Sequence, residues 1–197
     1  APVLLAHDVM VGEGSSALRL DQVEVVPDMW ASLMAREVRI AHLEVSGLQL
    51  SAKEDKDGHW ALQGLPMQDD QPLDPEQLLK RMQMVKRVSL LDSQVTLQPL
   101  DQAPLTLTYV GLSLHTGVTR QRLDVRLTLP DGQPLALSLR SRIRASQWKD
   151  AEVQAYLSLP QSDWAKWIPA RLTQQWKLTQ FKAGGEFWLK WGKGTVQ

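Results

Sequence analysis

The chain has 197 residues, of which 43% are hydrophobic and 22% are charged, values that are ordinary for a globular protein. Lysine and arginine together number 22, as do aspartate and glutamate, so the formal net charge is zero. This balance argues against a general nucleic-acid-binding protein and gives no support to electrostatic binding of anionic membranes. The chain has no cysteine, which excludes disulfides, thiolate metal sites and cysteine nucleophiles.

An alternation of apolar and polar residues with a period of two dominates the sequence, as in residues 123–129 and 135–139. Because neighbouring residues of a strand point to opposite faces, each strand should have one apolar face and one wet face. We therefore predict a mainly β fold, a curved and groove-like antiparallel sheet with about three short α-helices. We expect residues 1–197 to form a single β-rich segment of a larger protein.

Interruptions of the alternation predict where strands bend or end. The pattern changes phase between Ile40 and Leu43 and again between Val45 and Leu48, which indicates bulges or bends that Gly47 would ease. Two Asp-Gly dipeptides, at residues 57–58 and 131–132, are typical of hairpin turns.

Short helices are predicted near residues 29–35, 75–84 and 162–168. The second has Asp74 at its N-cap and Pro75 at its first position, and Pro169 would end the third. Residues 66–74, which are polar and bounded by prolines, predict a flexible loop.

Residues that could carry chemistry are scattered along the predicted strands. The four histidines, at positions 7, 42, 59 and 115, have no metal-ligand spacing, so we interpret them as ordinary strand or turn residues. Acidic residues such as Glu24, Glu44 and Asp124 fall on wet faces, and a glycosidase-like pair among them is a minor alternative. We predict no catalytic residue, no metal site, no cofactor and no enzymatic activity.

Eight tryptophans are an unusual number beside two phenylalanines and two tyrosines. Five of them crowd the last third of the chain, at positions 164, 167, 176, 188 and 191. They could pack in the core and at its rim, because tryptophan buries a large apolar body and keeps its N–H within reach of a partner. A sharper interpretation is an aromatic platform for sugars or a rim around an apolar groove.

The order of motifs resembles the AsmA-like superfamily of envelope proteins. A strand at 17–25, a helix at 29–33 containing Ser-Leu, a strand at 43–50 with Gly-x-x-Leu and the Asp-Gly-x-Trp of residues 57–60 follow one another. The later order is similar to the N-terminal periplasmic part of the YhdP branch. It is carried by residues 88–97 and 112–114, the Pro-Asp-Gly at 130–132, the two tryptophans at 164 and 167, and residues 187–192.

The resemblance implies a function in lipid transport. A YhdP-like protein would be periplasmic, anchored in the inner membrane through an N-terminal helix that this chain lacks. It would carry phospholipid along a β-groove between the inner and outer membranes of a Gram-negative cell. The expected partners are therefore phospholipid acyl chains, the inner membrane and the rest of the same polypeptide, with no nucleic acid.

Apolar positions on the strand centres are the candidates for contact with acyl chains. The predicted groove residues are Leu105, Leu107, Leu123, Val125, Leu127, Leu135 and Leu137. The alternative is a secreted β-sandwich that binds carbohydrate through exposed tryptophans. The direction of the tryptophan side chains separates the two, since a planar exposed row fits sugar and a rim around an apolar trough fits lipid.

Overall fold

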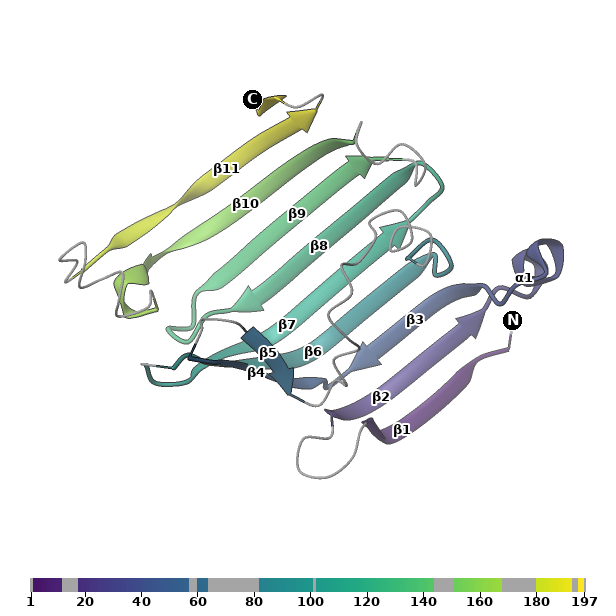
Figure 1. The fold of residues 1–197 in the computed structure, drawn as a ribbon, viewed down its shortest axis with the longest axis horizontal. Coiled ribbons are helices and arrows are strands. Elements are labelled where there is room, and N and C mark those ends of the chain that lie inside the picture. Colours follow the sequence, from purple (N-terminus) through teal and green to yellow (C-terminus); the bar gives the residue numbers. More distant parts are fainter. Residues whose placement is uncertain are drawn as a thin grey trace.

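The structure is a computed structural model that describes residues 2–11, 18–56, 60–63, 82–100, 102–143, 151–167, 180–192 and 195–196. Its strands form one sheet of 12 strands within these residues. Figure 1 shows this sheet as a broad twisted array with the two chain ends near opposite edges. The prediction of a mainly β fold is confirmed.

The described elements are nearly all strands. The strands are β1 (Leu4–Val11), β2 (Leu18–Pro27), β3 (Ile40–Ser46), β4 (Gln49–Glu54), β5 (Trp60–Gln63), β6 (Arg87–Gln98), β7 (Leu105–Thr116), β8 (Arg120–Thr128), β9 (Pro134–Arg142), β10 (Glu152–Asp163), β11 (Lys182–Gly192) and β12 (Thr195–Val196). One α-helix, α1 (Met29–Ala35), and one 3₁₀ turn, Trp164–Lys166, complete them.

The sheet combines antiparallel and parallel pairing. From β6 to β12 each strand lies antiparallel beside the next one in the chain, as predicted. Strands β3 and β4, however, both lie parallel to β6, so the prediction of a wholly antiparallel sheet is wrong at this point. Parallel pairing needs a long connection, and residues 64–86 between β5 and β6 supply one. Beside β6 the sheet forks, since β3 leads to β2 and β1, whereas β4 leads to β5.

Backbone irregularities fall where the alternation changes phase. The register between β2 and β3 shifts opposite Ile40 and His42, and Gly47, with φ at +67°, separates β3 from β4. Both predicted interruptions are confirmed. Two further bulges adopt positive φ at Asp92 in β6 and Tyr109 in β7, and the pairing registers shift there. The bulged strands lie side by side, so the irregularities form a line across the sheet.

Turns and helices agree with the prediction in part. Gly132, with φ at +81°, lies in the β8–β9 hairpin turn, and α1 forms over residues 29–35 as predicted. Residues 57–58, the loop at 66–74 and most of the helix predicted at 75–84 lie outside the described residues. The prediction of about three α-helices is wrong for the described part of the chain, which has one.

The helix predicted at 162–168 is replaced by strand and a single turn. Ser162 and Asp163 end β10 and pair with Ala183 and Lys182 of β11. The Asp163 carboxylate accepts a hydrogen bond from the backbone N–H of Phe181 and gives no helix cap. The backbone of residues 162–163 is therefore paired in the sheet and the Asp163 carboxylate bonds to Phe181 N, so neither is available to begin a helix.

The molecule has very little closed core. Within the described ranges only four hydrophobic residues are buried, namely Leu18, Ala52, Val110 and Leu129. The accessible surface of the chain is 14128 Å², whereas a compact monomer of this mass would expose about 9,400 Å². In the described part of the chain no helix has the length and apolarity that crossing a membrane requires. The fold is therefore an open sheet rather than a sandwich.

Candidate functional site

The strand registers place apolar side chains in two continuous rows across nine strands. Residues paired across neighbouring strands point to the same face of a sheet, so a row can be followed from pair to pair. The first row is Ala6, Val23, Val45, Leu90, Leu112, Val125, Leu137, Leu157 and Phe187. The second row is Leu4, Val25, Leu43, Val88, Leu114, Leu123, Leu139, Ala155 and Leu189. We call the surface defined by these two rows the apolar face.

The apolar face is not covered by a second layer of the described structure. None of its 18 residues is buried, and those on the edge strands are the most exposed, with Leu4 at 64%, Leu189 at 51% and Phe187 at 48%. A sheet with one apolar face normally buries it against another layer. This face therefore offers a large apolar surface for a further apolar partner.

The predicted groove residues lie on the apolar face or on its continuation. Leu123, Val125 and Leu137 belong to the two rows, and Leu127 and Leu135 are the next register pair on the same face. Leu105 and Leu107 pair with Leu97 and Val95 of β6, beyond the bulge at Tyr109. All seven predicted residues are half-buried.

Some members of the apolar face were missed by the sequence prediction. The strands β1, β2, β3, β6, β10 and β11 contribute apolar residues in register with those of β8 and β9. Their own alternation was visible in the sequence, as at Val23 and Val25 or at Leu157 and Leu159. Which of these residues share one face depends on the register between strands. The register can be assigned only when it is known which strands are neighbours.

The opposite face is polar over most of its width. One register row there is Glu24, Glu44, Ser89, Ser113, Asp124, Ser138, Tyr156 and Trp188. Polar contacts hold this face together, for example the 2.6 Å ion pair between Arg122 Nε and Asp124 Oδ2 and the 2.6 Å hydrogen bond that Ser138 Oγ donates to Asp124. Partial burial raises the pKa of Asp124, but the hydrogen bonds from Arg122 and Ser138 outweigh it and leave the pKa below its usual value.

The candidate acid–base residues lie on this polar face. His42 Nε2 is 3.1 Å from Ser89 Oγ and 3.7 Å from a Glu44 carboxylate oxygen, which ties it to its neighbours in the sheet. Glu24 and Glu44 are register partners on β2 and β3, whereas Asp124 lies several strands away. Among the described residues no group of three or more potential metal ligands comes together. His59 lies outside the described residues.

The described tryptophans do not form one planar row. Trp188 pairs with Tyr156 on the polar face, and their ring centroids are 5.3 Å apart. Trp191 pairs with Val153 and therefore lies on the side of the apolar face. Trp164 donates its indole N–H to the Ala183 carbonyl at 2.6 Å and contacts Trp167 edge to face. This arrangement gives no support to a carbohydrate platform.

Comparison with known proteins places the chain in a family. The family model described as YhdP protein matches residues 1–197, which is the whole chain. Neither the comparison with curated proteins nor that with solved structures gave a significant match. The predicted resemblance is confirmed by the family match. The chain belongs to the YhdP protein family.

Proposed function

We propose that this chain binds phospholipid acyl chains on its apolar face and lets them pass across the sheet, as one segment of a periplasmic, inner-membrane-anchored protein that carries phospholipid between the two membranes. The observation that supports this proposal most directly is the pair of apolar rows, which cross nine strands and remain partly exposed. Membership of the YhdP protein family supports the assignment to lipid transport.

The physical basis of the proposed binding is the hydrophobic effect. Each methylene group that moves from water onto the apolar face contributes about 0.8 kcal/mol. Nine strands at a spacing of about 4.8 Å span about 40 Å, whereas both leaflets of a bilayer together provide a hydrocarbon core of about 30 Å. The rows are therefore longer than one acyl chain.

The path needs no chemical step. An acyl chain moving from strand to strand along either row meets an apolar residue at each register position, so it crosses no polar barrier. The headgroup can remain in water, because the sheet is open on this side. The side chains act by excluding water from the chain, and no acid, base or nucleophile takes part.

Photo-crosslinking from the two faces tests the proposal. A photoreactive amino acid at Val125 or at its register partner Leu137 should capture phospholipid. Arg126 and Ala136, the adjacent register pair on the other face, are the matched controls and should not capture it. Native mass spectrometry of the purified chain should show bound phospholipid in addition.

Two outcomes would contradict the proposal. Equal crosslinking from both pairs would mean that lipid contact is unspecific, and the absence of crosslinking from either pair would mean that no lipid occupies the face.

Substitution Val125→Asp distinguishes an open apolar face from a closed core. On an open face water reaches the carboxylate and the protein stays folded while lipid binding falls, whereas in a closed core the buried charge unfolds it.

A further inference from the structure

Helix α1 presents its apolar side chains to solvent. The exposed residues are Met29 at 63%, Trp30 at 71%, Leu33 at 70% and Met34 at 69%, and Val38 just after the helix is 75% exposed. The spacing of the four helical residues places them on one side of the helix, while Ala31, Ser32 and Ala35 on the other side are half-buried. A surface helix of a globular protein turns its apolar stripe inward, so α1 has the opposite orientation. We call Met29, Trp30, Leu33, Met34 and Val38 the α1 stripe.

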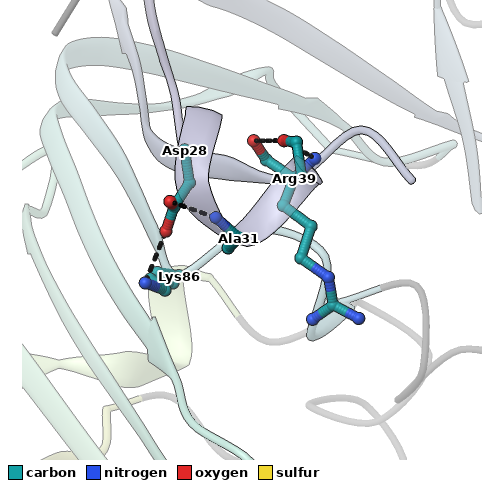
Figure 2. A network of polar contacts seen from close by, with 5 residues as sticks. Asp28, Ala31, Arg39 and Lys86 are labelled. Atoms are coloured by element: carbon teal, nitrogen blue, oxygen red, sulfur yellow. Dashed lines mark hydrogen bonds and ion pairs between the residues drawn. The ribbon is translucent and has the colours of Figure 1, made fainter. Parts of the chain in front are cut away.

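The helix is held in this orientation by its polar residues. The Asp28 carboxylate accepts a 2.9 Å hydrogen bond from Ala31 N and forms a 2.5 Å ion pair with Lys86 (Figure 2). The Ser32 hydroxyl accepts a 2.9 Å hydrogen bond from Arg39 N and donates one to the Arg39 carbonyl. These contacts attach α1 to the start of β3 and to the segment before β6. The exposed stripe is thus a fixed part of the fold.

The charges around the α1 stripe are mostly positive. Among the described residues, four cations lie on the helix end and on the adjoining segments, namely Arg36, Arg39, Lys86 and Arg87, with Asp28 and Glu37 as the anions beside them. Lys86 pairs with Asp28 and Arg39 lies 3.9 Å from Glu37, so Arg36 and Arg87 make up the positive excess. The balance of these six groups is +2, obtained from four cations and two anions, although the whole chain has a net charge of zero. An apolar stripe beside an excess of cations is complementary to the surface of an anionic phospholipid bilayer.

The position of α1 lets it reach a flat surface. Figure 1 shows α1 projecting at one end of the strands, where β2 ends and β3 begins, and close to the N-terminus of the chain. Tryptophan is enriched at membrane interfaces because its ring is apolar and its N–H remains hydrated. Trp30 supplies such a ring on the α1 stripe, with 71% of its surface exposed.

We propose that the α1 stripe docks onto an anionic phospholipid membrane, with Trp30, Leu33 and Val38 inserted among the headgroups and with Arg36 and Arg87 in contact with lipid phosphates. This membrane contact uses a surface other than the apolar face, so it stands independently of acyl-chain transport. The short helix has few residues to insert, and both the apolar and the electrostatic parts contribute to affinity.

Flotation of the full chain with vesicles tests the proposal. The chain should bind vesicles of phosphatidylethanolamine and phosphatidylglycerol more tightly than vesicles of phosphatidylcholine, and added salt should weaken the binding. Trp30→Ser and Val38→Asp should each lower the partition coefficient by about tenfold or more, the effect of losing one buried large apolar side chain. Both residues are exposed, so neither substitution should unfold the protein.

The chain offers closely matched controls. Trp188 on β11 is 67% exposed, nearly as much as Trp30, and lies at the other edge of the sheet from α1. Val11 is 41% exposed and pairs with Leu18, at the end of β1 and β2 that is far from α1. Trp188→Ser and Val11→Asp should leave vesicle binding unchanged. Equal losses from the control substitutions, or full binding by the Trp30→Ser and Val38→Asp chains, would overturn the proposal. Failure of the unaltered chain to float with anionic vesicles would also overturn it.

A second measurement separates this contact from lipid binding on the apolar face. The amount of co-purified phospholipid per chain is determined by native mass spectrometry for each variant. Trp30→Ser should lose vesicle binding and keep its bound phospholipid, whereas Val125→Asp should lose bound phospholipid and keep vesicle binding. Loss of vesicle binding in Val125→Asp together with full binding in Trp30→Ser would show that the apolar face, and not α1, contacts the membrane.

Discussion

Gly47 marks the point where the chain leaves β3 and enters β4. Its φ is +67°, and a Cβ built on it would lie 1.8 Å from Asp21 Oδ2 and 2.7 Å from Asp21 Cβ. The N–H of Gly47 donates to the Leu91 carbonyl, and Leu48 N donates to the buried Ser93 hydroxyl. The bend at Gly47, between β3 and β4, is therefore hydrogen-bonded to the bulge in β6.

Substitution Gly47→Ala should lower the free energy of unfolding by about 1–2 kcal/mol, because a residue with a Cβ is strained at positive φ and Asp21 must move. Urea denaturation followed by tryptophan fluorescence measures the change. Gly111→Ala is the control, since its new methyl group would lie 3.7 Å from the Leu90 carbonyl oxygen, at an ordinary contact distance. Equal stability of the two variants would show that Gly47 is not needed for the bend.

Asp28 and Asp124 should make the free energy of unfolding decrease at acid pH. Hydrogen bonds from Lys86 and the Ala31 backbone lower the pKa of Asp28. At Asp124, desolvation raises the pKa, and the hydrogen bonds from Arg122 and Ser138 lower it by more. The folded protein then binds fewer protons than the unfolded chain near the ordinary aspartate pKa of about 3.9. Their stabilising contribution is present above that pH and is lost as the pH falls below it.

Urea midpoints at pH 6 and pH 3 measure this loss. The midpoint should fall at pH 3, and the fall should be smaller in Arg122→Gln, which removes the ion pair with Asp124. Arg126→Gln, an exposed arginine on the same strand, should show the full fall. An identical fall in both variants would mean that the pairing of Asp124 does not contribute.

At the scale of elements, local signals determined what could be predicted. The α1 helix was predictable because Asp28 caps it through a side chain only three residues from Ala31. The helix expected at 162–168 had a similar local pattern. It does not form, because Ser162 and Asp163 pair with β11 instead. The parallel pairing of β3 and β4 with β6 was not predictable, since alternation looks the same in both kinds of pairing.

The candidate site also combines features that local sequence predicts with features that depend on pairing between distant segments. Alternation shows that Leu105 and Leu107 share a face, and so do Leu112 and Leu114. An uninterrupted strand would place the two pairs on opposite faces, because one pair is odd-numbered and the other even-numbered. The bulge at Tyr109 brings both pairs to the same face. The phase change was visible in the sequence, but the alignment of nine strands in one row depends on contacts distant in the chain.

The whole molecule should unfold with an unusually small change in exposed surface. Because the apolar face is already open, the slope of the unfolding free energy against urea should be lower than for compact proteins of about 200 residues, as should the heat-capacity change. Calorimetry and urea titration of the lipid-free chain measure both. Added phospholipid should raise the apparent stability, since it binds only the folded sheet. Values typical of a compact domain would indicate a closed core.

The neighbour-to-neighbour construction of the sheet makes its width adjustable. Tertiary contacts follow the order of the strands, so the β8–β9 hairpin contacts chiefly β7 on one side and β10 on the other. In a sandwich, removing two strands would leave a hole against the opposite layer. In this open sheet, gain or loss of a hairpin preserves the direction of every remaining strand and changes the width by about 10 Å. Duplication or deletion of hairpins can thus tune the distance that such a sheet spans, without any redesign of a core.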